Sequence, residues 1–93
     1  MRTEPLFDPP AVEALRRAQS ALQEALTHAE DDDESAALAA LSVLTAAKAA
    51  LAVAETEVAR RARARGASWR DLAAATGATR QGVTRRYRSR GVR

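Results

Sequence analysis

The chain has 93 residues, 46% of them hydrophobic, and a net charge of +3 at neutral pH. This length allows one small domain or a domain with an arm, and the absence of cysteine excludes disulfide bonds, zinc fingers and thiol chemistry. Twenty-four residues are alanine, which buries little apolar area, so the core should be thin. We therefore expect a homodimer, because a second copy would supply the missing burial.

Charge is divided unevenly along the chain. Residues 1–34 contain three arginines against nine acidic residues, whereas residues 35–93 contain twelve basic residues against three acidic ones. A basic half of this kind favours contact with a phosphate backbone. A genome rich in G and C would also produce fourteen arginines against one lysine, so the clustering of the arginines carries more information than their number.

The first predicted helix follows an N-terminal arm, residues 1–9. Pro9 and Pro10 suit the first turn of a helix, with Asp8 or Pro9 near the cap. Apolar residues then recur at spacings of three and four over about residues 10–29, which is the pattern of a coiled-coil seam. The seam of this helix comprises Val12, Leu15, Leu22 and Leu26.

A second, long helix is predicted after the acidic run at residues 31–34. Acidic side chains suit a helix start, and this run lacks the glycine and alternating ligands of a calcium loop, so we expect a cap and no metal or cofactor. No glycine or proline lies between Pro10 and Gly66, so this helix can reach Arg65 unbroken. Its seam comprises Leu41, Leu44 and Leu51.

Residues 10–52 are therefore predicted to form a helical hairpin that serves as the dimerisation region. Four such helices from two chains would bury both seams. An apolar stripe does not indicate which surface it packs against. Two other arrangements therefore remain open: an ordinary intramolecular bundle and a hairpin that binds a separate protein.

The chain is expected to be cytoplasmic and without membrane contact. Residues 36–54 are only moderately apolar and include Lys48 and several hydroxyls, which argues against a membrane span. The first ten residues lack the basic and then apolar regions of a signal peptide.

The most informative segment is residues 67–88. Ser68 suits an N-cap with Asp71 three residues on, which predicts a helix from about Trp69. Gly77 can adopt the left-handed conformation that ends a helix, and Thr79 is a second N-cap candidate. Two short helices joined by a sharp turn follow from these signals.

This segment resembles the bacterial helix-turn-helix of sigma factor region four, resolvases and many small regulators. In that motif an alanine precedes the turn glycine by four residues, as Ala73 precedes Gly77 here. The resemblance covers about a quarter of the chain, and Gly82 stands where the motif usually has Ala or Thr. It implies a three-helix DNA-binding region over residues 53–90 and a tail at 91–93. The end of the long helix would be the first helix of this region, with Val58 and Ala62 packing on Leu72, Val83 and Tyr87.

The resemblance also implies that the opening residues of the last helix meet base edges in the major groove. Arg can pair with guanine and Gln with adenine, while the Thr methyl group can meet thymine. The candidate base-reading residues are Thr79, Arg80, Gln81, Thr84 and Arg85. The candidate phosphate-binding residues are Arg60, Arg61, Arg63, Arg65, Ser68, Arg70, Arg86, Arg88 and Arg90.

Together these patterns predict an all-α protein that is not an enzyme and binds double-stranded DNA in a sequence-specific way. It would act as a small homodimeric transcriptional regulator or as a plasmid or phage maintenance factor. Two alternatives remain open. One is an architectural protein that binds DNA without sequence preference, and the other is a protein-interaction adaptor or antitoxin that uses the N-terminal hairpin.

Overall fold

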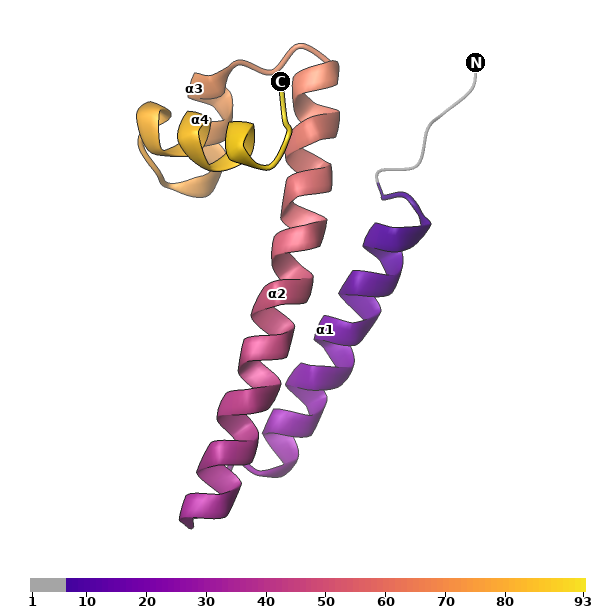
Figure 1. Ribbon diagram of the computed structural model, residues 1–93, viewed down its shortest axis with the longest axis vertical. Helices are drawn as coiled ribbons and strands as arrows, with labels where there is room; N and C mark the ends of the chain where they lie inside the picture. The colour runs from indigo at the N-terminus through magenta and orange to yellow at the C-terminus, as the bar shows by residue number, and fades with distance from the viewer. Residues whose placement is uncertain (1–6) are drawn as a thin grey trace. The chain divides into compact units, whose positions relative to one another are not determined.

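A computed structural model describes residues 7–93, and over this range the chain forms α-helices and no β-strand (Figure 1). The helices are α1 (Pro9–Thr27), α2 (Glu34–Ala64), α3 (Trp69–Thr76) and α4 (Arg80–Ser89). The all-α prediction is thus confirmed. Residues 1–6 of the predicted arm lie outside the described residues. The described chain divides into two compact units, Phe7–Ala54 and Glu55–Arg93, and α2 belongs to both.

Helix α1 begins where the sequence provides an acceptor for its first free amides. The Oδ1 atom of Asp8 accepts a hydrogen bond from the backbone N–H of Ala11 at 3.0 Å, and prolines occupy the first two helical positions. The helix ends at Thr27, two residues before the predicted end, and His28 follows as its C-cap.

Helix α2 starts in the acidic run and continues to the glycine that the sequence places after it. The Oδ1 atom of Asp33 accepts a hydrogen bond from the Ala36 N–H at 2.6 Å, and Glu34 lies in the first turn, where negative charge is favoured. The helix ends before Gly66, which has φ +101°. Its last turn carries Arg61 and Arg63, which suit the carbonyl end.

In the unit of residues 7–54, α1 and the first part of α2 run in opposite directions (Figure 1). The buried side chains of this unit are all alanines: Ala11, Ala14 and Ala18 on α1, and Ala47 and Ala54 on α2. The larger members of the predicted seam are half-buried, as Val12 and Leu15, or exposed, as the five leucines that follow. Those are Leu22, Leu26, Leu41, Leu44 and Leu51. Small residues let two helices approach closely, which leaves longer side chains beside the contact and not within it.

Among the described helices, α2 is long and apolar enough by length and composition to cross a membrane. An 18-residue window within it has a mean hydropathy of 1.9, and only 6% of that window is buried. Alanine supplies much of this hydropathy. A helix from a soluble protein can pass the same test, so the expectation of no membrane contact stays a prediction.

The unit of residues 55–93 has a conventional core of larger side chains. Val83, Tyr87 and Val92 are each at most 1% exposed, and Trp69 and Leu72 are buried beside them. Two alanines, Ala59 and Ala73, complete this core.

Two details of this core differ from the sequence-based expectations. Helix α2 buries Ala59 in it, whereas Val58, which we expected to pack there, is half-buried. The segment predicted as a tail contributes Val92, because Gly91, at φ +85°, turns the chain back after α4. The Val92 N–H then donates to the Tyr87 carbonyl at 2.9 Å.

Candidate functional site

The start of α3 is fixed by a reciprocal pair of hydrogen bonds. The Ser68 hydroxyl oxygen accepts from the Asp71 N–H at 3.0 Å, and the Asp71 carboxylate accepts from the Ser68 N–H at 2.8 Å. The hydrogen bond from the Ser68 N–H, and to a lesser extent the Ser68 side chain, favours the ionised carboxylate and lowers the pKa of Asp71 below its usual 3.8. The Ser68 side chain is therefore committed to holding the helix start.

The turn between α3 and α4 depends on Gly77, whose φ is +70°. Backbone N–H groups of Gly77 and Ala78 both donate to the Ala73 carbonyl, the latter at 3.2 Å. Thr79 then opens α4, since its Oγ1 accepts from the Gly82 N–H at 3.0 Å. The chain thus reverses within three residues between two capped helices.

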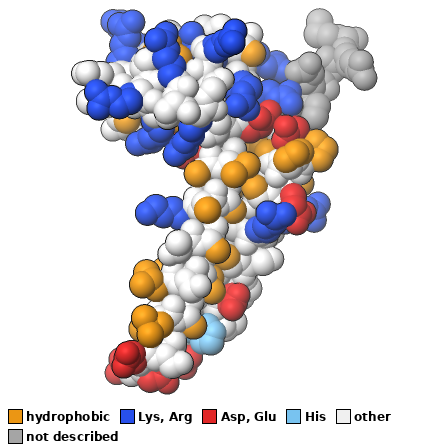
Figure 2. Space-filling model, viewed as in Figure 1, with side chains coloured by type: hydrophobic (Ala, Val, Ile, Leu, Met, Phe, Trp, Pro, Cys, Tyr) orange, Lys and Arg blue, Asp and Glu red, His pale blue; other side chains and the backbone are white. Residues whose placement is uncertain are grey.

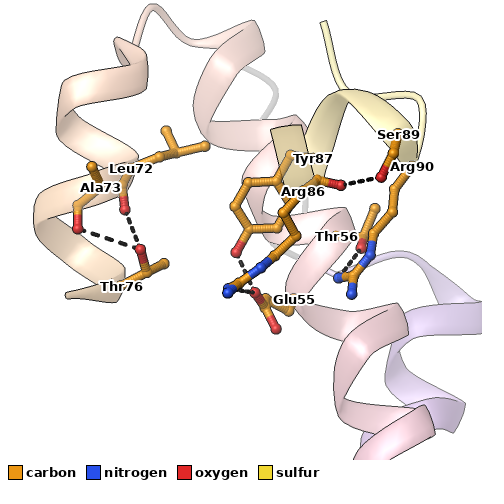
Figure 3. A network of polar contacts seen from close by, with 9 residues as sticks. All are labelled: Glu55, Thr56, Leu72, Ala73, Thr76, Arg86, Tyr87, Ser89 and Arg90. Carbon is orange, nitrogen blue, oxygen red and sulfur yellow. Dashed lines mark hydrogen bonds and ion pairs between the residues drawn. The ribbon is translucent and has the colours of Figure 1, made fainter. Parts of the chain in front are cut away.

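One side of α4 is held against the rest of its unit. Val83 and Tyr87, one helical turn apart, fill the core, and Ala73 lies against them in the same cluster. The Tyr87 hydroxyl donates to the Glu55 carboxylate, which also pairs with Arg86 at 3.5 Å (Figure 3). Burial raises the pKa of Tyr87, and the Glu55 carboxylate raises it further. The buried side of α4 is therefore fixed by packing and by a charged acceptor.

Several of the arginines predicted to bind phosphate already have partners within the chain. Arg60 and Arg61 both pair with Glu57, at 2.8 and 3.3 Å respectively. Arg90 donates to the Thr56 hydroxyl at 3.2 Å (Figure 3). Together with Arg86, these side chains are partly neutralised or oriented by α2.

Arg63 has the most extensive set of internal contacts. Its Nη1 donates to the Ala67 carbonyl at 2.7 Å, and its Nε donates to the Arg93 carbonyl at 3.0 Å. Its guanidinium also lies 4.5 Å from the centre of the Trp69 ring. A second guanidinium, from Arg88, lies 5.7 Å from the same ring. Arg63 thus joins the end of α2 to α3 and to the end of the chain.

The remaining side of α4 has a different character. Arg80, Gln81 and Arg85 are exposed and make no side-chain hydrogen bond or ion pair with any described residue. They border an open hollow of about 530 Å³. The residues that line this hollow are Trp69, Arg80, Gln81, Thr84, Arg85 and Arg88. On the face drawn in Figure 2, Lys and Arg side chains gather over residues 55–93. We call this exposed side of α4, with residues 80, 81, 84, 85 and 88, the arginine face.

The structure therefore sorts the predicted site residues into two sets. The first set has internal partners: Arg60, Arg61, Arg63, Ser68, Thr79, Arg86 and Arg90, and also Thr84, whose hydroxyl donates to the Arg80 carbonyl at 2.7 Å. The second set is exposed and makes no side-chain hydrogen bond or ion pair with the described residues, although Arg88 lies over the Trp69 ring: Arg65, Arg70, Arg80, Gln81, Arg85 and Arg88.

Sequence reasoning missed the acidic partners of the first set. Glu57 lies three and four residues before Arg60 and Arg61, a spacing that predicts helical ion pairs. Glu55 carries no such signal, because its partner Tyr87 is 32 residues away in the sequence.

The chain was compared with known protein families, curated proteins and solved structures. No protein-family model, curated protein or solved structure matches the chain.

Proposed function

We propose that this protein binds double-stranded DNA and reads its sequence by placing α4 in the major groove. In this proposal α3, the Gly77 turn and α4 form a helix-turn-helix, the end of α2 is its supporting helix, and residues 10–52 form a helical hairpin. The observation that carries the proposal is the arginine face. On it Arg80, Gln81 and Arg85 have no side-chain hydrogen-bond or ion-pair partner among the described residues, while the other side of the helix is buried.

A sequence reader needs side chains that are held in register but free to bond. Helix α4 is anchored at its start by Thr79 and along its length by Val83 and Tyr87. Its ten residues span about 15 Å, and an α-helix fits the major groove, which is about 12 Å wide. Arg80 and Arg85 have the fork of donors that suits guanine, and Gln81 has the donor and acceptor pair that suits adenine.

Affinity would come from cations whose guanidinium groups are not already paired. Arg65 and Arg70 are exposed and make no side-chain hydrogen bond or ion pair within the described chain, and Arg88 is exposed with its guanidinium over the Trp69 ring. These three are the strongest candidates for phosphate contacts. Arg60 and Arg86 should contribute less, because a DNA phosphate would have to compete with Glu57 and Glu55 for them.

A matched pair of neighbouring substitutions tests this assignment. A preferred duplex is first selected from a random DNA pool, and the affinities of Arg85→Ala and Arg86→Ala are then measured on it and on a random duplex. Both variants lose one positive charge, so a general charge effect is equal in the two. We expect Arg85→Ala to weaken the selected site by about 1–3 kcal/mol, or about 5- to 150-fold, with little change on the random duplex. Arg86→Ala should change neither by more than about threefold, since Arg86 faces Glu55.

Other outcomes would redirect the proposal. Equal losses for both variants on both duplexes would remove α4 from base reading and favour the architectural alternative. Selection that enriches no motif, with binding that disappears as salt rises, would do the same. An absence of binding at low salt would leave the adaptor alternative.

A further inference from the structure

The unit of residues 7–54 keeps its large apolar side chains out of the contact between its own helices. Its buried residues are alanines, while Leu22, Leu26, Leu41, Leu44 and Leu51 remain between 45% and 66% exposed. A monomeric soluble protein seldom exposes so many large apolar residues on one small unit. The directions of these leucines around their helices decide whether they form one surface.

The helical period gives the direction of each leucine around its helix axis. With about 100° of rotation per residue, the centre of the leucine stripe on α1 lies about 80° onward from the buried alanines Ala11, Ala14 and Ala18. On α2 the stripe of Leu41, Leu44 and Leu51 also lies about 80° onward from Ala47 and Ala54, in the same rotational sense.

Because α1 and α2 run in opposite directions (Figure 1), equal rotations in the same sense bring both stripes to the same side of the pair. The two stripes therefore form one continuous surface and do not face each other. We call it the leucine face, and it comprises Val12, Leu15, Leu22, Leu26, Leu41, Leu44 and Leu51. Figure 2 shows hydrophobic side chains spread along the surface of this unit.

We propose that a second copy of the same chain covers the leucine face, so that two helix pairs form a four-helix bundle. Val12 to Leu26 spans about 21 Å of helix, and two adjacent helices are about 20 Å wide, so each copy offers on the order of 400 Å² in projection. The relief of the side chains raises the accessible area, and a pair of copies buries on the order of 1,000 Å², near the lower limit of a specific interface. Interfaces at this lower limit belong to weak associations, so the dimer is sought up to high micromolar concentrations.

The composition of the face favours a second copy over a different partner. A twofold contact sets the same leucines against each other, and the partner is present in every solution of the chain. Two polar residues, Gln19 and Lys48, also lie on this side, about 110° onward from the alanines and between Leu15 and Leu22 on α1 and between Leu44 and Leu51 on α2, and their flexible side chains can reach solvent at the rim of the bundle. A twofold axis perpendicular to the helices also separates the two acidic turns at residues 31–34, which repel each other.

The test is the mass of the full chain in solution without DNA, so its outcome does not depend on the function proposed above. Light scattering and sedimentation equilibrium are recorded from about 1 to 500 μM for the unmodified chain and for Leu22→Asp and Leu44→Asp. Leu38→Asp and Val53→Asp are the matched controls. Both control positions lie in α2 and are exposed to a similar extent, at 58% and 52%. Val53 lies about 165° around α2 from the centre of its leucine stripe and points away from the leucine face, whereas Leu38 lies about 105° from that centre, outside the stripe.

We expect the unmodified chain to become dimeric within this range. Leu22→Asp and Leu44→Asp should raise the dissociation constant at least about 30-fold, because the bundle would bury an unpaired carboxylate. The two controls should change it less than about threefold. Circular dichroism should give the same helix content for all five proteins, because each substituted side chain is exposed within a single chain.

A monomer at every concentration would overturn the proposal, and so would equal weakening by face and control substitutions. Binding of the unmodified chain to phosphatidylcholine–phosphatidylglycerol vesicles, lost in Leu44→Asp, together with a monomeric mass would assign the face to a membrane surface instead.

Discussion

Replacing Gly82 by alanine separates two opposing effects at the start of α4. Gly82 is the third residue of this helix, and its N–H donates to the Thr79 Oγ1 at 3.0 Å. A Cβ atom added at Gly82 would also lie 3.0 Å from that oxygen, tighter than nine in ten real Cβ contacts. The added methyl group therefore favours the helix but displaces the hydroxyl that caps it.

The two effects are similar in size. Alanine is about 0.8–1 kcal/mol more favourable than glycine within a helix. A threonine cap contributes about 1 kcal/mol, and part of this is lost when its oxygen must move by a few tenths of an ångström. We expect Gly82→Ala to change the free energy of unfolding by less than about 0.5 kcal/mol. In a Thr79→Ala background no hydroxyl opposes the methyl group, and the same substitution should stabilise the protein by about 0.8 kcal/mol or more.

Denaturant unfolding followed by tryptophan fluorescence measures both values. Trp69 is the only tryptophan in the chain and lies in the core that α4 completes, so the signal reports this unit. Ala74→Gly, at an exposed position of α3, is the matched control and should cost about the same in both backgrounds. Equal stabilisation by Gly82→Ala with and without the Thr79 hydroxyl would refute the reasoning, because it would show that the methyl group and the cap do not compete.

Three further predictions concern the same unit. Tyr87 is the only tyrosine in the sequence, so phenolate absorbance reports it alone, and we expect it to titrate above pH 10. Glu55→Gln should remove only part of this increase in pKa, because burial is the larger cause. The raised pKa means that the folded state favours the neutral phenol. The phenol therefore contributes fully to the free energy of unfolding below pH 10, and this contribution is lost as pH rises through the folded-state pKa. A folded-state pKa of 10 or below would contradict this prediction. Val92→Ala should lower the free energy of unfolding by about 1.5–2.5 kcal/mol, whereas Val53→Ala, at a half-exposed position, should cost less than about 0.5. The lowered pKa of Asp71 stabilises the fold above about pH 4, and this contribution disappears as pH falls through the folded-state value, so Asp71→Asn should flatten the acid side of a pH–stability curve.

Helix boundaries could be predicted closely because their signals act over three or four residues. Asp8, Ser68 and Thr79 each accept a hydrogen bond from an amide three residues on, and Gly77 ends α3 with a left-handed turn. Such bonds need only the local sequence. Thr79 as an N-cap predicts that the last helix begins at Arg80, and α4 begins there.

Which apolar stripe faces inward could not be predicted in the same way. The spacing of the leucines indicates a stripe on each helix, but a stripe alone does not say whether it faces the partner helix or lies beside it. Within one chain the alanines form the contact, and the leucines remain outside. Contacts between residues far apart in the sequence could not be predicted either. Examples are the hydrogen bond between Tyr87 and Glu55 and the packing of Val92 in the core.

The contacts of Arg63 distinguish arginines that the fold requires from those that a G- and C-rich genome would supply. Fourteen arginines and one lysine make up the basic residues, and at an exposed position such as Arg65 a lysine would carry the same charge. Arg63 differs, because a flat guanidinium bonds two carbonyl groups and lies over the Trp69 ring. An ammonium group cannot match that plane and its separate donors. A lysine-rich redesign of this chain, made for instance to ease expression in another host, should therefore retain arginine at this position.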